Sequence, residues 1–146
     1  MKFNRDFKIG LIICSSYLLW AITYLIWVLT IGEWPTQNIR IELLEPFSKE
    51  YILGTDIYGR SILGMLSAGV LYSLVFALVT AFSSTLIGIV AGGIMALASS
   101  RIAAVVEGIC NTIYIFPTIL VAILVMSFWE GTTFTLWITL VSVSWP

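Results

Sequence analysis

The chain carries few side chains suited to acid–base, nucleophilic or metal chemistry. It has no histidine, and Glu107 is the only carboxylate near the interior of an apolar segment. No second acid shares a helix face with Glu107, so a proton-transfer pair is missing. Cys14 and Cys110 lie in apolar runs without metal-ligand spacing or a histidine partner. The sequence predicts a protein that is not an enzyme, with no catalytic residue, no cofactor and no metal site.

One polar pattern has a defined spacing, in the sequence L-G-T-D-I-Y-G-R at residues 53–60. Gly54 permits a turn, and Thr55 or Asp56 can cap a helix N-terminus. Asp56 and Arg60 would pair at i, i+4 on that helix. Extending the helix places polar residues on one face and apolar residues on the other. We expect a short amphipathic helix at the membrane interface, with a structural role.

Long apolar segments flank this pattern. The chain is 60% hydrophobic and 10% charged, which is unlike a soluble domain. Three segments, 9–31, 70–98 and 102–128, are long enough to cross a bilayer. A fourth, 134–145, has about a dozen apolar-rich residues where a crossing needs about 20. The predicted fold is an all-α polytopic membrane protein with three full spans and a truncated fourth.

Basic residues predict the orientation. Three of them crowd the short tail before the first span: Lys2, Arg5 and Lys8. Their density favours a cytoplasmic N-terminus, with residues 33–59 outside. Trp34 and Trp129 would then be aromatic anchors at the outer interface.

Small residues recur at helical spacing in the second span. The candidate packing residues are Gly69, Ser73, Gly88 and Gly92. Small side chains let helix backbones approach closely in lipid, where the hydrophobic effect does not drive association. Two interpretations stay open: packing within the chain, and a subunit interface or pore wall.

Asn111 and Pro117 interrupt the third span. Pro117 removes a backbone hydrogen bond and kinks the helix. Asn111 is expected to be a buried polar group in need of a partner. Local packing is one interpretation, and a kink with a polar contact along a substrate pathway is the other.

As a pattern, L-G-T-D-x-x-G-R after one membrane anchor resembles a known family. Gly69 with Ser73-Leu74, Phe116-Pro117 and Trp145-Pro146 extend the match along the whole chain. The chain is similar to the C-type permease subunit of bacterial binding-protein-dependent ABC importers for dipeptides, oligopeptides and nickel. The resemblance implies a type I importer transmembrane domain over 53–146, preceded by an anchor helix and outer loop over 1–52.

Four features depart from that family. Ser61 and Asn111 stand where the family usually has aspartate, and Leu71 where it tends to have arginine. The E-A-A loop that follows the family's Trp-Pro pair and docks on the ATPase is absent, so we expect only the N-terminal half.

The resemblance implies a non-catalytic transport subunit in the bacterial inner membrane. It would form part of a pathway for peptides or nickel complexes, with the lack of histidine favouring peptides slightly. The implied partners are a second permease subunit, ATP-binding subunits, an extracytoplasmic substrate-binding protein and the lipid bilayer, with no nucleic acid. A second class stays open, a truncated, transport-inactive membrane protein with a structural or interaction role.

Overall fold

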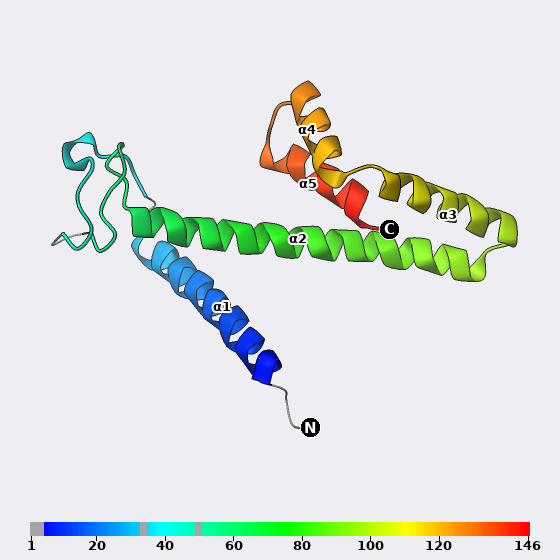
Figure 1. Ribbon diagram of the computed structural model, residues 1–146, viewed down its shortest axis with the longest axis horizontal. Coiled ribbons are helices and arrows are strands. Elements are labelled where there is room, and N and C mark those ends of the chain that lie inside the picture. Colours follow the sequence, from blue (N-terminus) through cyan, green and yellow to red (C-terminus); the bar gives the residue numbers. More distant parts are fainter. Residues whose placement is uncertain (1–4, 33–34, 49–50) are drawn as a thin grey trace. The chain divides into compact units, whose positions relative to one another are not determined.

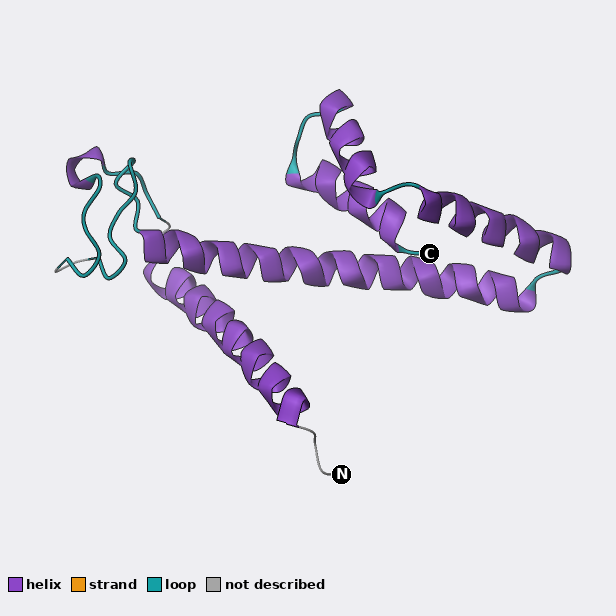
Figure 2. Ribbon diagram, viewed as in Figure 1, coloured by secondary structure: helices purple, strands orange, loops and turns teal. Residues whose placement is uncertain are grey.

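The computed structural model describes residues 5–32, 35–48 and 51–146, and its regular structure is helical (Figures 1 and 2). Lys2 and Trp34 therefore lie outside the described residues. The elements in chain order are α1 (Arg5–Ile31), the 3-10 turn η1 (Ile39–Ile41), α2 (Ile62–Leu97), α3 (Ser100–Ile115), α4 (Thr118–Phe128) and α5 (Thr133–Ser144). The all-α prediction is confirmed for the part of the chain that the structure describes.

Two helices are long and apolar enough to cross a membrane. α1 has 27 residues and α2 has 36. At 1.5 Å per residue α2 is about 54 Å long, whereas the hydrocarbon core is about 30 Å thick. α2 begins at Ile62, eight residues before the predicted span, so one helix contains both the interfacial stretch and the span.

The predicted third span is broken in two. α3 and α4 meet at an angle of 83°, where Phe116 adopts an extended backbone with φ −85° and ψ 124°. The ring of Pro117 disfavours helical geometry at Phe116, and Pro117 lacks the N–H that would continue the helix. The described residues therefore contain two candidate spans, or three if this bent pair counts as one.

The last apolar stretch is also helical. The Thr132 side chain caps α5 by accepting a hydrogen bond from the Thr135 N–H at 3.1 Å, and α5 packs against α4. With 12 residues, α5 is shorter than a crossing requires.

The chain forms two compact units, Met1–Val75 and Phe76–Pro146. The division predicted at residue 53 rests on the resemblance and stays a prediction. In the first unit, Trp20 Nε1 of α1 donates a hydrogen bond to Ser67 Oγ of α2 at 3.0 Å, and Ser67 is buried. Ala21 is buried on α1 next to Trp20. A polar contact of this kind ties helices together in lipid.

In the second unit, the end of α5 approaches α2 and α3. A Cβ on Gly88 would lie 2.9 Å from the Trp145 carbonyl oxygen, so the missing side chain permits the approach. The Tyr114 hydroxyl donates a hydrogen bond to the Pro146 carbonyl at 2.7 Å. Of the three glycines predicted to pack against another helix, Gly88 is the one with a close neighbour among the described residues, the Trp145 carbonyl.

Candidate functional site

The loop between α1 and α2 contains the L-G-T-D-x-x-G-R pattern and is ordered by its own backbone. Among the described residues, four backbone–backbone hydrogen bonds join its two halves: Asn38 N–H to Tyr58 C=O (3.0 Å), Leu43 N–H to Asp56 C=O (3.1 Å), Thr55 N–H to Leu44 C=O (3.2 Å) and Phe47 N–H to Ile52 C=O (2.9 Å). Residues 38–47 therefore lie alongside residues 52–58 in a hairpin-like arrangement. Three of these hydrogen bonds involve a residue of the L-G-T-D-x-x-G-R motif, and the fourth involves Ile52, directly before it.

Both glycines of the motif are required by the backbone. Gly54 has φ +76° and Gly59 has φ +68°, values that residues with a side chain rarely adopt. A Cβ on Gly54 would overlap the Leu44 carbonyl oxygen, and one on Gly59 would overlap the Asn38 carbonyl. The turn predicted at Gly54 is confirmed, and Gly59 has the same role at the next corner.

Thr55 joins the two halves of the loop instead of capping a helix. Its hydroxyl donates to the Ile41 carbonyl at 2.5 Å and accepts from the Leu44 N–H at 2.9 Å. The side chain is buried, so both backbone groups depend on it for a partner.

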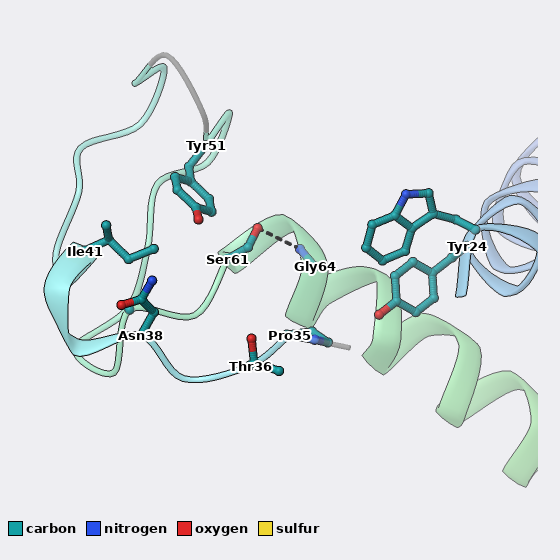
Figure 3. A pocket seen from close by; sticks show the side chains of 10 residues that line it. Tyr24, Pro35, Thr36, Asn38, Ile41, Tyr51, Ser61 and Gly64 are labelled. Atoms are coloured by element: carbon teal, nitrogen blue, oxygen red, sulfur yellow. Dashed lines mark hydrogen bonds between the residues drawn. The ribbon is translucent and has the colours of Figure 1, made fainter. Parts of the chain in front are cut away.

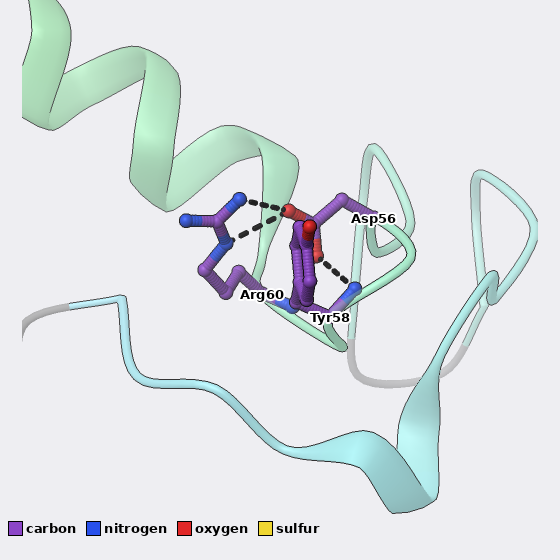
Figure 4. Close-up of polar contacts among 3 residues, drawn as sticks. All are labelled: Asp56, Tyr58 and Arg60. Atoms are coloured by element: carbon purple, nitrogen blue, oxygen red, sulfur yellow. Dashed lines mark hydrogen bonds and ion pairs between the residues drawn. The ribbon is translucent and has the colours of Figure 1, made fainter.

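Asp56 and Arg60 form the predicted ion pair, but in a turn rather than a helix (Figure 4). Asp56 Oδ1 accepts the N–H groups of Tyr58 (2.9 Å) and Arg60 (2.8 Å). Asp56 Oδ2 lies 2.7 Å from an Arg60 terminal nitrogen and 2.8 Å from Arg60 Nε. The Arg60 guanidinium also lies over the Tyr58 ring, 4.9 Å from its centroid.

The amphipathic helix expected to start at this motif is therefore a wrong prediction. An aspartate that accepts the N–H two residues later favours a turn, and here it does so while Gly59 adopts positive φ. The helix starts only at Ile62. Ser61 Oγ accepts the Gly64 N–H at 3.2 Å, as a capping residue does.

The pKa of Asp56 is lowered from its ordinary value of 3.8. Desolvation raises the pKa of this carboxyl, but hydrogen bonds from Arg60 and Tyr58 and the charge of Arg60 together outweigh it. These contacts favour the carboxylate form. Asp56 is therefore a charged structural group at neutral pH.

A cavity of about 380 Å³ lies between this loop and the end of α1 (Figure 3). Tyr24 and Trp27 line it from α1, and Asn38, Tyr51 and Ser61 line it from the loop. The described residues that line it carry aromatic, amide and hydroxyl groups, and none of them is charged.

The other candidate residues lie apart from this loop. Gly69 and Ser73 line an apolar groove of about 560 Å³ with Tyr17 of α1. No neighbouring atom among the described residues would meet a Cβ on Gly69 or Gly92 within 4 Å. Their predicted packing role stays a prediction.

Asn111 and Pro117 lie in the second unit. Asn111 is exposed on α3 within this chain, and the expectation that it is a buried polar group with a partner in the membrane stays a prediction. Pro117 stands at the break between α3 and α4.

Sequence reasoning missed the partners that the motif requires. Asn38 and Leu44 supply the carbonyl groups next to Gly59 and Gly54, and Trp20 pairs with Ser67 across 47 positions. No local spacing signals such contacts. The two glycines of the motif, Gly54 and Gly59, were the available sequence signal, because glycine often marks a place where another backbone segment passes close by.

Comparison with known proteins adds no assignment. No protein-family model matches the chain, and no curated protein matches it. Inference about function therefore starts from the loop motif and the apolar helices.

Proposed function

We propose that the chain is an inner-membrane permease subunit of a bacterial ABC importer. It would form part of the translocation pathway for peptides or nickel complexes. One observation carries the proposal: each of the five motif residues, Gly54, Thr55, Asp56, Gly59 and Arg60, has a distinct contact or backbone geometry that its residue type suits. These contacts give the motif a structural role in the loop, and the link to the importer family rests on the resemblance of the motif.

The position of the motif also supports the proposal. It lies directly before α2, the longest apolar helix described, and after a single candidate span. The resemblance implies this order of anchor, outer loop and transmembrane domain.

Of the residues that differ from the family pattern, Ser61 has a contact that explains how the change is tolerated. The family usually has aspartate at this position, and Ser61 Oγ accepts the Gly64 N–H at the start of α2. Serine and aspartate are both good N-cap residues, since each offers a side-chain oxygen to the first turn. The replacement keeps this contact and removes one negative charge.

In this proposal the subunit performs no chemistry. ATP hydrolysis by partner subunits shifts the pathway between outward and inward openings, and a second permease subunit and a substrate-binding protein complete the assembly. The bent α3–α4 pair, with Pro117 at the bend and Asn111 on α3, is the candidate pathway wall.

Transport is tested in the host. The gene is deleted, and uptake of a radiolabelled dipeptide and of radioactive nickel is measured with and without a plasmid copy. We expect uptake of one substrate to fall and to return with the plasmid. A tagged copy should co-purify with an ATPase whose activity a substrate-binding protein stimulates. Unchanged uptake of both, with no ATPase recovered, contradicts the proposal and supports a membrane protein without transport activity.

Orientation is tested separately. We propose that the N-terminus is cytoplasmic and that the α1–α2 loop is outside, because Lys2, Arg5 and Lys8 come before the apolar run at residues 9–31. A cysteine at Gln37, in a chain with Cys14 and Cys110 replaced by alanine, should react with an impermeant maleimide added outside intact cells. Reaction only after the cells are opened reverses the orientation and the importer proposal with it.

A further inference from the structure

Among the described residues of the α1–α2 loop, five large apolar side chains are more than half exposed. Their exposed fractions are 85% for Phe47, 74% for Ile39, 66% for Leu43, 60% for Ile52 and 59% for Ile57. We call these five residues the apolar loop patch. Apolar side chains gathered on one exposed segment mark a surface that contacts another apolar phase.

The backbone that carries these side chains is ordered by hydrogen bonds. Phe47 is joined to Ile52 by a backbone hydrogen bond of 2.9 Å, and Leu43 is joined to Asp56, the neighbour of Ile57, by one of 3.1 Å. Gly54, Thr55 and Gly59 hold the centre of the loop, where all three are buried. The exposed side chains are therefore attached to an ordered backbone.

Two members of the patch adopt a backbone that favours glycine. Leu43 has φ +52° and Phe47 has φ +63°, in the left-handed region that bulky residues rarely occupy. Turn geometry alone would favour glycine or asparagine at both positions. Large apolar residues there indicate a role for the side chains themselves.

The ends of the loop connect it to two helices that can cross the membrane. α1 ends at Ile31 and α2 begins at Ile62, and both helices are apolar and long enough to cross the membrane. If both cross, both ends of the connecting loop emerge on the same face of the membrane. The apolar phase that continues from the surfaces of these two helices is the lipid of the adjoining leaflet.

We propose that the apolar loop patch inserts into the boundary between headgroups and acyl chains of that leaflet. Glu42 and Glu45 alternate with the patch residues and are exposed. Their carboxylates stay at headgroup level because transfer into hydrocarbon is costly, so only side chains enter the lipid. Insertion fixes the height of the loop and of the cavity beside it. The proposal requires two spans but no transport activity.

Nitroxide accessibility tests the proposal in the full chain. Cys14→Ala and Cys110→Ala provide a cysteine-free background, since the chain has two cysteines. Phe47→Cys and Ile52→Cys are spin-labelled in separate samples, in vesicles of phosphatidylethanolamine and phosphatidylglycerol. Gln37→Cys and Glu42→Cys, exposed polar positions of the same loop, are matched controls.

Oxygen concentrates in hydrocarbon, whereas a water-soluble nickel chelate is excluded from it. We expect the ratio of oxygen to nickel collision rates to be severalfold higher at positions 47 and 52 than at 37 and 42. Equal ratios at the four positions overturn the proposal. Labels at 47 and 52 that are open to nickel in pure lipid but shielded from both reagents in host membranes also overturn it, and assign the patch to a protein partner.

Discussion

The carbonyl oxygen of Asn38 occupies the space that a Cβ on Gly59 would need. Gly59 also has φ +68°, so a side chain there meets both a steric overlap and a disfavoured backbone. The left-handed backbone alone costs about 1–2 kcal/mol for a residue with a Cβ. Asn38 and Gly59 thus explain why the loop closes only with glycine at this corner.

Gly59→Ala should loosen the loop. We expect amide exchange at Asn38 to become about tenfold faster or more, since about 1.4 kcal/mol corresponds to a factor of ten. Hydrogen exchange followed by mass spectrometry measures this. Gly69→Ala is the matched control, because a Cβ there would meet no atom of another described segment within 4 Å. Equal effects of the two substitutions would contradict the role of Gly59.

Thr55→Val should open the contact between the two halves of the loop. The substitution leaves the Leu44 N–H and the Ile41 carbonyl without the hydroxyl that now pairs with both. An unpaired buried polar group costs about 1–3 kcal/mol. Amide exchange at Leu44 is the measurement, and Thr55→Ser, which keeps the hydroxyl, should retain most of the protection. Identical exchange in the two variants would show that shape rather than hydrogen bonding matters.

The loop should lose order in acid through Asp56. Its pKa in the folded chain lies below the ordinary value of 3.8. The carboxylate therefore contributes its full stabilisation above that value and loses it as the pH falls through the lower, folded pKa. The amide NMR signals of Tyr58 and Arg60 should shift in that window, below about pH 4. Asp56→Asn should abolish the shift, and a transition near pH 6 would point to another group.

Arg60→Lys should be milder than Gly54→Val. Lysine keeps a positive charge near Asp56 but loses the two-nitrogen contact at 2.7 Å and 2.8 Å. Valine at Gly54 would overlap the Leu44 carbonyl at φ +76°. Recovery of folded protein from membranes should fall further for Gly54→Val. If Arg60→Lys abolished transport in an intact complex, Arg60 would act in gating or substrate contact.

Pro117→Ala should reduce the bend between α3 and α4. Alanine restores an N–H and removes the clash that keeps Phe116 out of the helical region. Spin labels at Gly108 and Leu124 should move apart, toward the distance of about 24 Å expected over a continuous helix at 1.5 Å per residue. Double electron–electron resonance spectroscopy measures the distance between the two labels. An unchanged distance would show that packing of α4 on α5 holds the bend.

The sequence determines the helices and where they break. A run such as residues 9–31 has enough apolar length to cross hydrocarbon, and a helix satisfies its backbone polar groups there. The break at Phe116-Pro117 follows from the proline ring, and the turn at Gly54 follows from glycine's freedom at positive φ. These are local effects of covalent geometry and hydropathy, so they can be predicted without knowing what lies nearby.

Tertiary structure alone decided how the motif is used. A four-residue separation between Asp56 and Arg60 suits both a helix and a turn, and local spacing cannot choose between them. The choice came from groups distant in the chain: the Asn38 and Leu44 carbonyls beside the glycines, and the Ile41 carbonyl that accepts the Thr55 hydroxyl. Trp20 likewise meets Ser67 only because α1 and α2 cross. Such contacts depend on how the backbone returns upon itself, because a buried polar group takes its partner from whichever segment folds next to it.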